Sequence, residues 1–164
     1  DSYAEIDREF AQRFGRGGTP FVEEYRCDDA RFVAVAIGSL SYQLRDVIDQ
    51  LREDGLAIGV MGVQMYRPFP DQAIAAALAG KECVIVLEKA LSYGNQGPLY
   101  GDIKSALYRL DNRPVLHNYI LGLGGREIRT QQLLDVLAQS CARPREIEDT
   151  PRWIGLKLQE EHHG

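Results

Sequence analysis

The sequence predicts an α/β fold, a three-layer sandwich in which helices cover both faces of a mainly parallel central sheet. Short apolar runs, typical of strands buried on both faces, alternate along the chain with stretches whose apolar residues recur at the helical period. Such alternation indicates strand–helix–strand units, whose right-handed crossovers place helices on both sides of the sheet. The 164 residues, 45% of them apolar, suffice for one domain with its own core.

The first element is a helix expected over residues 2–14, because apolar residues there recur at spacings of three and four. A glycine-rich segment ends this helix, and residues 21–29 are expected to run extended into the main body. The apolar face of the helix consists of Tyr3, Ile6, Phe10 and Phe14.

A first strand–helix–strand unit begins near residue 31. Residues 32–37 form an unbroken apolar run, as a strand covered on both faces requires. Ser39 is placed to cap the helix that follows, whose apolar positions repeat at the helical period as far as Leu51. Gly55 closes this helix, and a second strand is expected within residues 56–65.

The same alternation continues through the second half of the chain. Pro70 is expected at the first position of a short helix that ends at Gly80, because proline suits the first helical turn. Pro98 opens another helix in the same way, and Thr130 is placed to cap the last one. The remaining strands are expected at residues 83–87 and 115–121.

Composition and charge exclude several classes of function. The net charge is −5 and the basic residues do not cluster, which argues against nucleic acid as a partner. No apolar run reaches the ~20 residues of a membrane-spanning helix, so no membrane partner is expected. The N-terminal residues show no signal peptide. We therefore expect a cytoplasmic protein.

The cysteines and histidines argue against a metal centre or a catalytic device built by this chain alone. Cys27, Cys83 and Cys141 lie far apart, and no C-x-x-C pair occurs, so three reduced thiols are expected and no iron–sulfur cluster. Cys83 lies in a predicted strand and should pack as an inert core residue. His117 also lies within an apolar strand, which favours a core residue over a catalytic one.

Ligand sites in open α/β sheets lie at the carboxyl ends of the strands, so the turns there are the candidates. The glycines of residues 122–125 look like part of a dinucleotide fingerprint, but its third glycine position is occupied by Glu127, a carboxylate facing the pyrophosphate. A tight turn is the better interpretation. Glu88 and Lys89 end another strand, and neighbouring strand residues point to opposite faces, so they cannot form one acid–base site.

The strongest candidate is the loop of residues 92–98 together with Arg67. The loop is longer and more polar than a simple connection needs, and it ends at a helix N-terminus, which favours anions. Two interpretations stay open: a docking surface for a neighbouring domain, which we favour, and a site for a small anion. Arg67, stiffened by the prolines after it, suits a carboxylate at an interface. The interface candidates are Arg67, Ser92, Tyr93, Gly94, Asn95, Gln96, Gly97 and Pro98.

Four ordered segments resemble the second core domain of pyruvate:ferredoxin oxidoreductases, which are 2-oxoacid:ferredoxin oxidoreductases. Residues 23–30 carry Glu-Glu-Tyr-Arg followed by Asp-Asp-Ala, and residues 67–70 carry Arg-Pro-Phe-Pro. Residues 92–99 match Ser-x-Gly-x-x-Gly-Pro-Leu. Residues 122–128 match Gly-Leu-Gly-Gly-Arg-Asp-Ile except that Glu127 replaces the aspartate.

The resemblance implies a transketolase C-terminal-like fold, with one antiparallel strand at the edge of the parallel sheet. It also implies a division of the chain. Residues 1–22 resemble the helix that joins the first two domains of the family and are expected to be a linker helix with an extended lead-in. Residues 23–143 are expected to form the transketolase C-terminal-like domain II, and residues 144–164 a C-terminal tail that serves as a docking or linker segment.

The resemblance finally implies a role. The whole enzyme converts pyruvate to acetyl-CoA by oxidative decarboxylation and passes electrons to ferredoxin. Thiamine diphosphate, magnesium and [4Fe–4S] clusters are implied in its other domains, so this chain is expected to hold no cofactor and no catalytic residue. Its implied partners are the other domains or subunits of the enzyme, with ferredoxin and coenzyme A acting on the whole complex. Two alternatives stay open: the same domain of an enzyme for another 2-oxoacid, and a free-standing module that binds a small anion.

Overall fold

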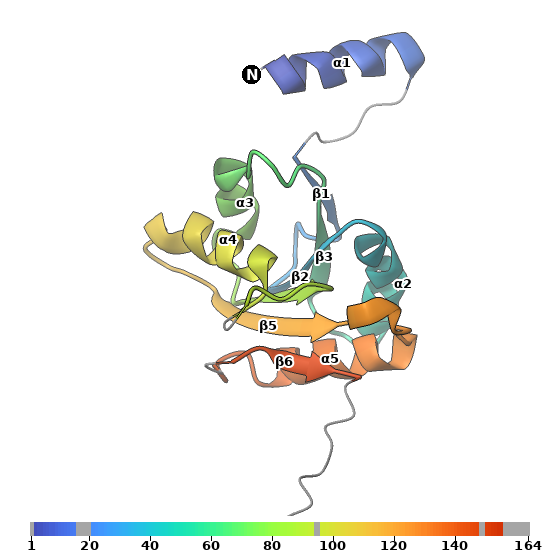
Figure 1. Ribbon diagram of the computed structural model, residues 1–164, viewed down its shortest axis with the longest axis vertical. Helices are drawn as coiled ribbons and strands as arrows, with labels where there is room; N and C mark the ends of the chain where they lie inside the picture. The colour runs from blue at the N-terminus through green and yellow to red at the C-terminus, as the bar shows by residue number, and fades with distance from the viewer. Residues whose placement is uncertain (1, 16–20, 94–95, 148–149, 156–164) are drawn as a thin grey trace, which may run out of the picture.

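The computed structural model describes residues 2–15, 21–93, 96–147 and 150–155, and these residues form one mixed sheet flanked by helices (Figure 1). The strands are β1 (Val22–Tyr25), β2 (Phe32–Ile37), β3 (Ile58–Val63), β4 (Cys83–Glu88), β5 (Val115–Leu121) and β6 (Arg152–Ile154). Their order is β1-β3-β2-β4-β5-β6. β1 runs antiparallel to β3, and the other neighbouring pairs are parallel. The mainly parallel sheet with an antiparallel edge strand is therefore confirmed.

Helices cover both faces of this sheet, as the three-layer prediction requires. α2 (Ser39–Glu53) and α5 (Thr130–Ala142) lie on one face, and α3 (Asp71–Leu78) and α4 (Pro98–Ala106) lie on the other (Figure 1). Short 3-10 turns follow α4 and β5; they are η1 (Leu107–Arg109) and η2 (Leu123–Gly125).

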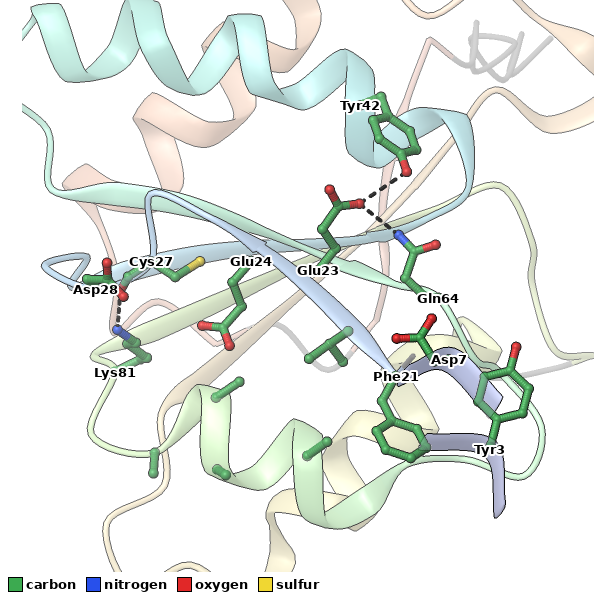
Figure 2. Close-up of a pocket in the computed structure, with 15 residues that line it drawn as sticks. Tyr3, Asp7, Phe21, Glu23, Glu24, Cys27, Asp28, Tyr42, Gln64 and Lys81 are labelled. Carbon is green, nitrogen blue, oxygen red and sulfur yellow. Dashed lines mark hydrogen bonds between the residues drawn. The ribbon is translucent and has the colours of Figure 1, made fainter. Parts of the chain in front are cut away.

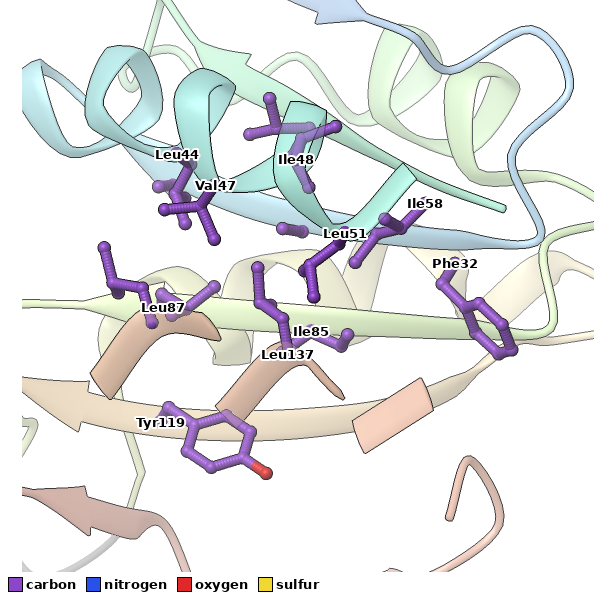
Figure 3. Packing of buried hydrophobic residues seen from close by; sticks show 14 of the residues in the cluster. Phe32, Leu44, Val47, Ile48, Leu51, Ile58, Ile85, Leu87, Tyr119 and Leu137 are labelled. Carbon is purple, nitrogen blue, oxygen red and sulfur yellow. The ribbon is translucent and has the colours of Figure 1, made fainter. Parts of the chain in front are cut away.

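Two apolar cores, one on each face, hold the layers together. On one face Leu44 of α2 and Leu137 of α5 pack against Ile85 of β4 (Figure 3). On the other face Ile103 of α4 packs with Val84 of the same strand. Because β4 contributes alternate residues to both cores, all six of its residues are buried, which explains its continuous apolar sequence. Each fully buried leucine or isoleucine contributes about 1.5–3 kcal/mol to this packing.

Three helices begin one residue away from the position that the capping signals predict: α2 and α5 begin one residue earlier, and α3 begins one residue later. Ser39 and Thr130 are the first helical residues and not the caps; the caps are Gly38 and Arg129. Gly38 has a φ of 66°, a left-handed conformation that favours glycine, and it takes the cap position. α3 likewise uses Pro70 as its cap and not as its first residue, whereas α4 begins at its proline as predicted.

The segment after residue 144, expected to be a tail, contributes a strand. β6 pairs in parallel with β5, so that Arg152 lies opposite Tyr119. Arg152 Nη1 donates a hydrogen bond to the Tyr119 hydroxyl at 2.8 Å, and that hydroxyl lies 2.9 Å from the Ser140 hydroxyl of α5. β6 is therefore tied to both the sheet and a helix. The remaining residues from 156 onward lie outside the described residues.

α1 (Ser2–Phe14) confirms the helix expected at the start of the chain and stands apart from the sheet (Figure 1). Its apolar side chains are exposed within the described residues, from 45% at Phe10 to 63% at Ile6. The rings of Phe10 and Phe14 lie 4.6 Å apart along this face. The ring of Tyr3 in α1 lies 6.4 Å from the ring of Phe21 in the body.

Candidate functional site

The turns at the carboxyl ends of β3 and β4 meet beside the start of α4 and enclose a hollow of about 420 Å³. Arg67 comes from the turn after β3, and Ser92, Gln96, Gly97 and Pro98 come from the loop after β4. The structure thus brings Arg67 and the predicted loop together. Gly94 and Asn95 lie outside the described residues. The described lining of the hollow is Arg67, Ser92, Gln96, Gly97, Pro98, Gly101, Asp102 and Ser105.

Arg67 forms its described contacts inside this chain. Its Nη2 donates a hydrogen bond to Asp102 of α4 at 2.9 Å, and its Nη1 donates one to the backbone oxygen of Tyr66 at 2.8 Å. The guanidinium also stacks 3.9 Å from the centre of the Tyr66 ring. The Arg67 side chain is 58% exposed, so screening by water keeps the contribution of the ion pair with Asp102 to stability small.

The loop after β4 has a closed base and an exposed tip. The backbone N–H of Ser92 donates a hydrogen bond to the backbone oxygen of Gln96 at 2.9 Å, which closes the base. Tyr93 at the tip is fully exposed, with a relative accessibility of 106%. Two further apolar side chains at this edge, Ile37 at the end of β2 and Leu91 in the loop, are also exposed. Large side chains that suit an interface are therefore exposed at the carboxyl edge of the sheet.

Glu88, at the end of β4, anchors the far end of the loop, a role that the sequence analysis missed. Its side chain is 6% exposed. The carboxylate accepts hydrogen bonds from the backbone N–H groups of Leu99 at 2.8 Å and Tyr100 at 3.2 Å, and from the Nδ2 of Asn118 in β5 at 3.0 Å. It thus lies at the N-terminus of α4, where the helix dipole favours negative charge. Lys89, the residue after β4, is exposed.

Burial controls the ionisation of this carboxyl. It raises the pKa of Glu88 above its ordinary value, and the hydrogen bonds from Leu99, Tyr100 and Asn118 offset that effect only in part. The negative charge of Asp102 on α4 acts in the same direction as burial. Glu88 is therefore a buried acid, and hydrogen bonds from Leu99, Tyr100 and Asn118 stabilise its charged form.

Gly97 leaves the space that the Glu88 carboxylate fills. A side-chain carbon at position 97 would overlap with the carboxylate oxygens of Glu88. Its φ of −66° is open to any residue, so the close approach explains this glycine. The backbone N–H of Gly97 donates a hydrogen bond to Oδ1 of Asn118 at 3.0 Å. Asn118 therefore joins Glu88 to the loop end, with its amide nitrogen toward the acid and its oxygen toward the loop.

This arrangement weakens the small-anion interpretation of the loop. The N–H groups of Leu99 and Tyr100 at the start of α4 would have to bind the anion, and Glu88 already accepts hydrogen bonds from both. A bound anion would also lie against the Glu88 carboxylate. At the start of α4, where the anion interpretation would place a ligand, the structure has the side chain of Glu88.

The glycine turn after β5 has the geometry of a tight turn. Gly122, Gly124 and Gly125 have φ values from 65° to 78°, a range that favours glycine over other residues. Arg126 donates a hydrogen bond to the backbone oxygen of Gly155 at 3.0 Å, which ties the turn to the residue after β6. This geometry supports the turn interpretation over a dinucleotide site.

All three thiols are buried, and their surroundings disfavour the thiolate. Burial raises the pKa of Cys27 to about 11 and the pKa values of Cys83 and Cys141 to about 12. Iron–sulfur clusters need cysteine thiolates as ligands, so this donor set does not fit one. Among the described residues, no group of three or more His, Cys, Asp or Glu side chains is arranged to hold a metal ion. His117 is buried in β5, with its ring edge-on to Tyr119.

A wider groove of about 1270 Å³ lies between β1 and α3, with α1 at one end (Figure 2). Alanines of α3 line it, and Glu24 and Asp28 lie along it. Glu23 also lines the groove, and its carboxylate accepts hydrogen bonds from Tyr42 and Gln64 (Figure 2). Lys81 donates hydrogen bonds to the backbone oxygens of Cys27 and Ala30. The sequence analysis did not single out this groove, and it lacks the anchored loop of the carboxyl edge.

No helix in the described ranges is both long enough and apolar enough to cross a membrane.

The match to a family of known proteins covers most of this domain. The family model described as pyruvate:ferredoxin oxidoreductase core domain II matches residues 30–133. The chain belongs to this family. The matched residues include Arg67 and the loop after β4 that line the hollow.

Two curated relatives show how the chain compares with whole subunits. The pyruvate synthase subunit PorA of Thermotoga maritima is 40% identical over 155 residues, which cover 94% of this chain and 39% of that subunit. The ketoisovalerate oxidoreductase subunit VorA of Pyrococcus abyssi is 33% identical over 159 residues, which cover 93% of this chain and 39% of that subunit. The chain therefore spans about two fifths of the length of the curated relatives it matches.

Two solved structures share the fold. The 2-oxoglutarate:ferredoxin oxidoreductase from Magnetococcus marinus, solved with 2-oxoglutarate, coenzyme A and succinyl-CoA bound, gives a TM-score of 0.55 at 17% identity over 82% of this chain and 21% of that one. A split-gene transketolase in an inactive beta4 tetramer gives a TM-score of 0.53 at 15% identity over 70% of this chain and 39% of that one. The transketolase-like fold predicted from the sequence is confirmed.

Proposed function

We propose that this chain is a structural and interaction domain of the alpha subunit of a pyruvate:ferredoxin oxidoreductase and that it carries no catalytic residue of its own. Membership of the core domain II family supports the placement in such an enzyme. The pyruvate synthase relative, at 40% identity, supports pyruvate as the substrate of the whole complex. Oxidative decarboxylation of pyruvate to acetyl-CoA is then the activity to which this domain contributes.

The single observation that supports an interaction role is the composition of the carboxyl edge. We call the docking surface the hollow and its loop: Arg67, Ser92, Tyr93, Gln96, Gly97 and Pro98, with Gly94 and Asn95 retained from the sequence. It combines a stacked arginine with a fully exposed tyrosine, the residue types that most often dominate binding energy at protein interfaces. The exposed apolar side chains of Ile37 and Leu91 lie at the same edge.

We place the cofactors of the complex outside this chain. The buried, protonated thiols are unsuited to bind a [4Fe–4S] cluster, which supports an assignment of the clusters to other domains. Thiamine diphosphate and magnesium are assigned there too, as are the contacts with ferredoxin and coenzyme A. The partners of this domain are then the other domains or subunits of the same enzyme. Three free thiols favour a reducing compartment such as the cytoplasm.

A second candidate is the same domain in an enzyme that acts on another 2-oxoacid. The observation that favours it is the 33% identity to a ketoisovalerate oxidoreductase subunit over nearly the same residues. The domain would then play the same part beside a different substrate pocket, which lies in other domains under either proposal.

The test is the change Arg67→Ala, made both in this chain and in the enzyme that contains it. Loss of charge-assisted hydrogen bonds should weaken assembly with the partner domains by about 1–3 kcal/mol. The melting temperature of the chain should change little, because the Arg67–Asp102 pair is exposed. Assembly is measured by co-purification with the partner domains, and stability by thermal unfolding.

Arg31→Ala is the matched control, because Arg31 also forms an exposed ion pair, with Glu82, at the amino ends of the strands. It should leave assembly unchanged. A large drop in melting temperature for Arg67→Ala with assembly unchanged would show that Arg67 supports the fold and not the interface.

A further inference from the structure

We propose that Glu88 is the positioning residue of the docking surface: its buried carboxylate fixes the end of the 92–98 loop against the first turn of α4. This inference rests on the proposed function, because it concerns the same surface. Glu88 itself does not line the hollow, and any effect it has on a partner acts through the loop.

The contacts of Glu88 join three elements at one point. The acid ends β4, two of its donors are backbone N–H groups of α4, and its third donor, Asn118, belongs to β5. Asn118 then accepts a hydrogen bond from the backbone N–H of Gly97, the residue before α4. The chain leaves β4 at Glu88 and returns to the same carboxylate eleven residues later, so this group closes the loop.

The hydrogen-bonding groups around Glu88 match the acceptor capacity of a carboxylate. A carboxylate only accepts hydrogen bonds, and the three groups that face it, from Leu99, Tyr100 and Asn118, all donate. A glutamine at this position would turn an NH₂ group toward one of those donors. The acid also orients Asn118, because the Asn118 amide nitrogen points to Glu88 and leaves the oxygen for the loop.

The same anchor fixes the hollow. Gly97 and Pro98 line the hollow directly, and Arg67 is bonded to Asp102 in the second turn of α4. The loop end and Arg67 are therefore both positioned relative to the start of one helix, which Glu88 holds against the sheet. A surface ordered before binding loses less conformational entropy when the partner arrives.

The experiment uses Glu88→Gln in this chain and in the enzyme that contains it, with amide hydrogen exchange and partner affinity as readouts. Because charge-assisted hydrogen bonds are lost, the amides of Gly97, Leu99 and Tyr100 should exchange about tenfold faster or more. The affinity for the partner domains should fall as the loop end loses this protection. Glu82→Gln is the control: it makes the same change just before β4, where Glu82 pairs with Arg31, and it should leave those three amides unchanged.

A second variant tests the donor and acceptor logic. In the double variant Glu88→Gln, Asn118→Asp, the amide at position 88 can donate a hydrogen bond to the carboxylate at position 118. The second oxygen of that carboxylate can still accept the hydrogen bond from the backbone N–H of Gly97. The double variant should recover a large part of the lost protection at Gly97, which a purely steric role of Glu88 would not allow. Recovery therefore supports the proposal, and a further loss of protection counts against it.

The outcomes separate this inference from the proposed function. Unchanged exchange at Gly97, Leu99 and Tyr100 in Glu88→Gln overturns the positioning role. Faster exchange with unchanged partner affinity supports Glu88 as the anchor of the loop and overturns the docking surface. Faster exchange together with weaker affinity supports both.

Discussion

A carboxyl group buried beside a helix N-terminus is subject to two opposing effects, and at Glu88 burial is the larger. Hydrogen bonds from Leu99, Tyr100 and Asn118 favour the charged form, while removal from water and the charge of Asp102 disfavour it. The net result is a pKa above the ordinary value of 4.5. The folded protein therefore binds a proton at Glu88 more tightly than the unfolded chain does, and this difference makes stability depend on pH.

We predict that wild type gains stability relative to Glu88→Gln as the pH falls from neutral. A raised folded pKa contributes stability that is fully present below the unfolded value of 4.5 and is lost as the pH rises through the folded value. Urea unfolding of both proteins at a series of pH values from neutral to below 4.5 measures the difference. Asp102 is present in both proteins, so its contribution is common to the two measurements. A wild type that loses stability relative to the variant on acidification would contradict this prediction.

The sequence predicted which residues line the hollow of the proposed docking surface, but it did not predict the contacts that hold them in place. Arg67 and the loop were predicted to meet because the carboxyl ends of parallel strands share one edge, and the structure places them around one hollow. The strand alternation also predicted that Glu88 and Lys89 face opposite ways. The partners of Glu88 lie 11 and 30 residues away in the sequence, and no local pattern connects them. The signal that could have indicated this contact is a glutamate at a strand end that is followed in the sequence by a Gly-Pro helix start.

At the scale of secondary structure, hydrophobic pattern predicted where elements lie but not where they end. β4 was predictable because both of its faces are buried, which leaves a continuous apolar run. The start of α2 moved by one residue because Gly38 adopts a left-handed conformation that no sequence rule for serine caps anticipates. β6 was missed because three residues cannot show an alternation, and its central Trp153 is 41% exposed.

We predict that Tyr119→Phe destabilises the domain, because the Tyr119 hydroxyl joins three elements. It lies in β5, accepts a hydrogen bond from Arg152 of β6 at 2.8 Å and lies 2.9 Å from the hydroxyl of Ser140 in α5. Tyr119 and Ser140 are both buried, so removal of the hydroxyl should cost about 1–3 kcal/mol of the free energy of unfolding. Denaturant unfolding measures this cost.

Tyr108→Phe serves as the control for that measurement, since Tyr108 is 72% exposed and the same atom is removed. It should change the free energy of unfolding by less than about 0.5 kcal/mol, as exposed substitutions usually do. Equal effects of the two changes would show that the Tyr119 hydroxyl does not tie β6 to the rest of the domain.

At the scale of the whole molecule, we predict that the chain alone is catalytically silent. Its described residues offer buried thiols and a carboxylate engaged in capping a helix, and neither group is available to a substrate. The purified 164 residues should not reduce a viologen dye when pyruvate is added, whereas the complete enzyme should. The complete enzyme, assayed in parallel, is the control. Measurable turnover by the chain alone would contradict the non-catalytic role.

The two outermost strands of the sheet limit how the domain can associate. β1 has four residues, with Glu23 and Glu24 at its centre, and β6 has three. Sheet edges with unpaired backbone groups invite other strands to pair with them, and short or charged edges discourage this. The domain is therefore poorly suited to extend into a continuous sheet with a neighbouring molecule. Many copies can be present in a crowded cell with little tendency to polymerise edge to edge, and contacts with partners then depend on side chains and loops.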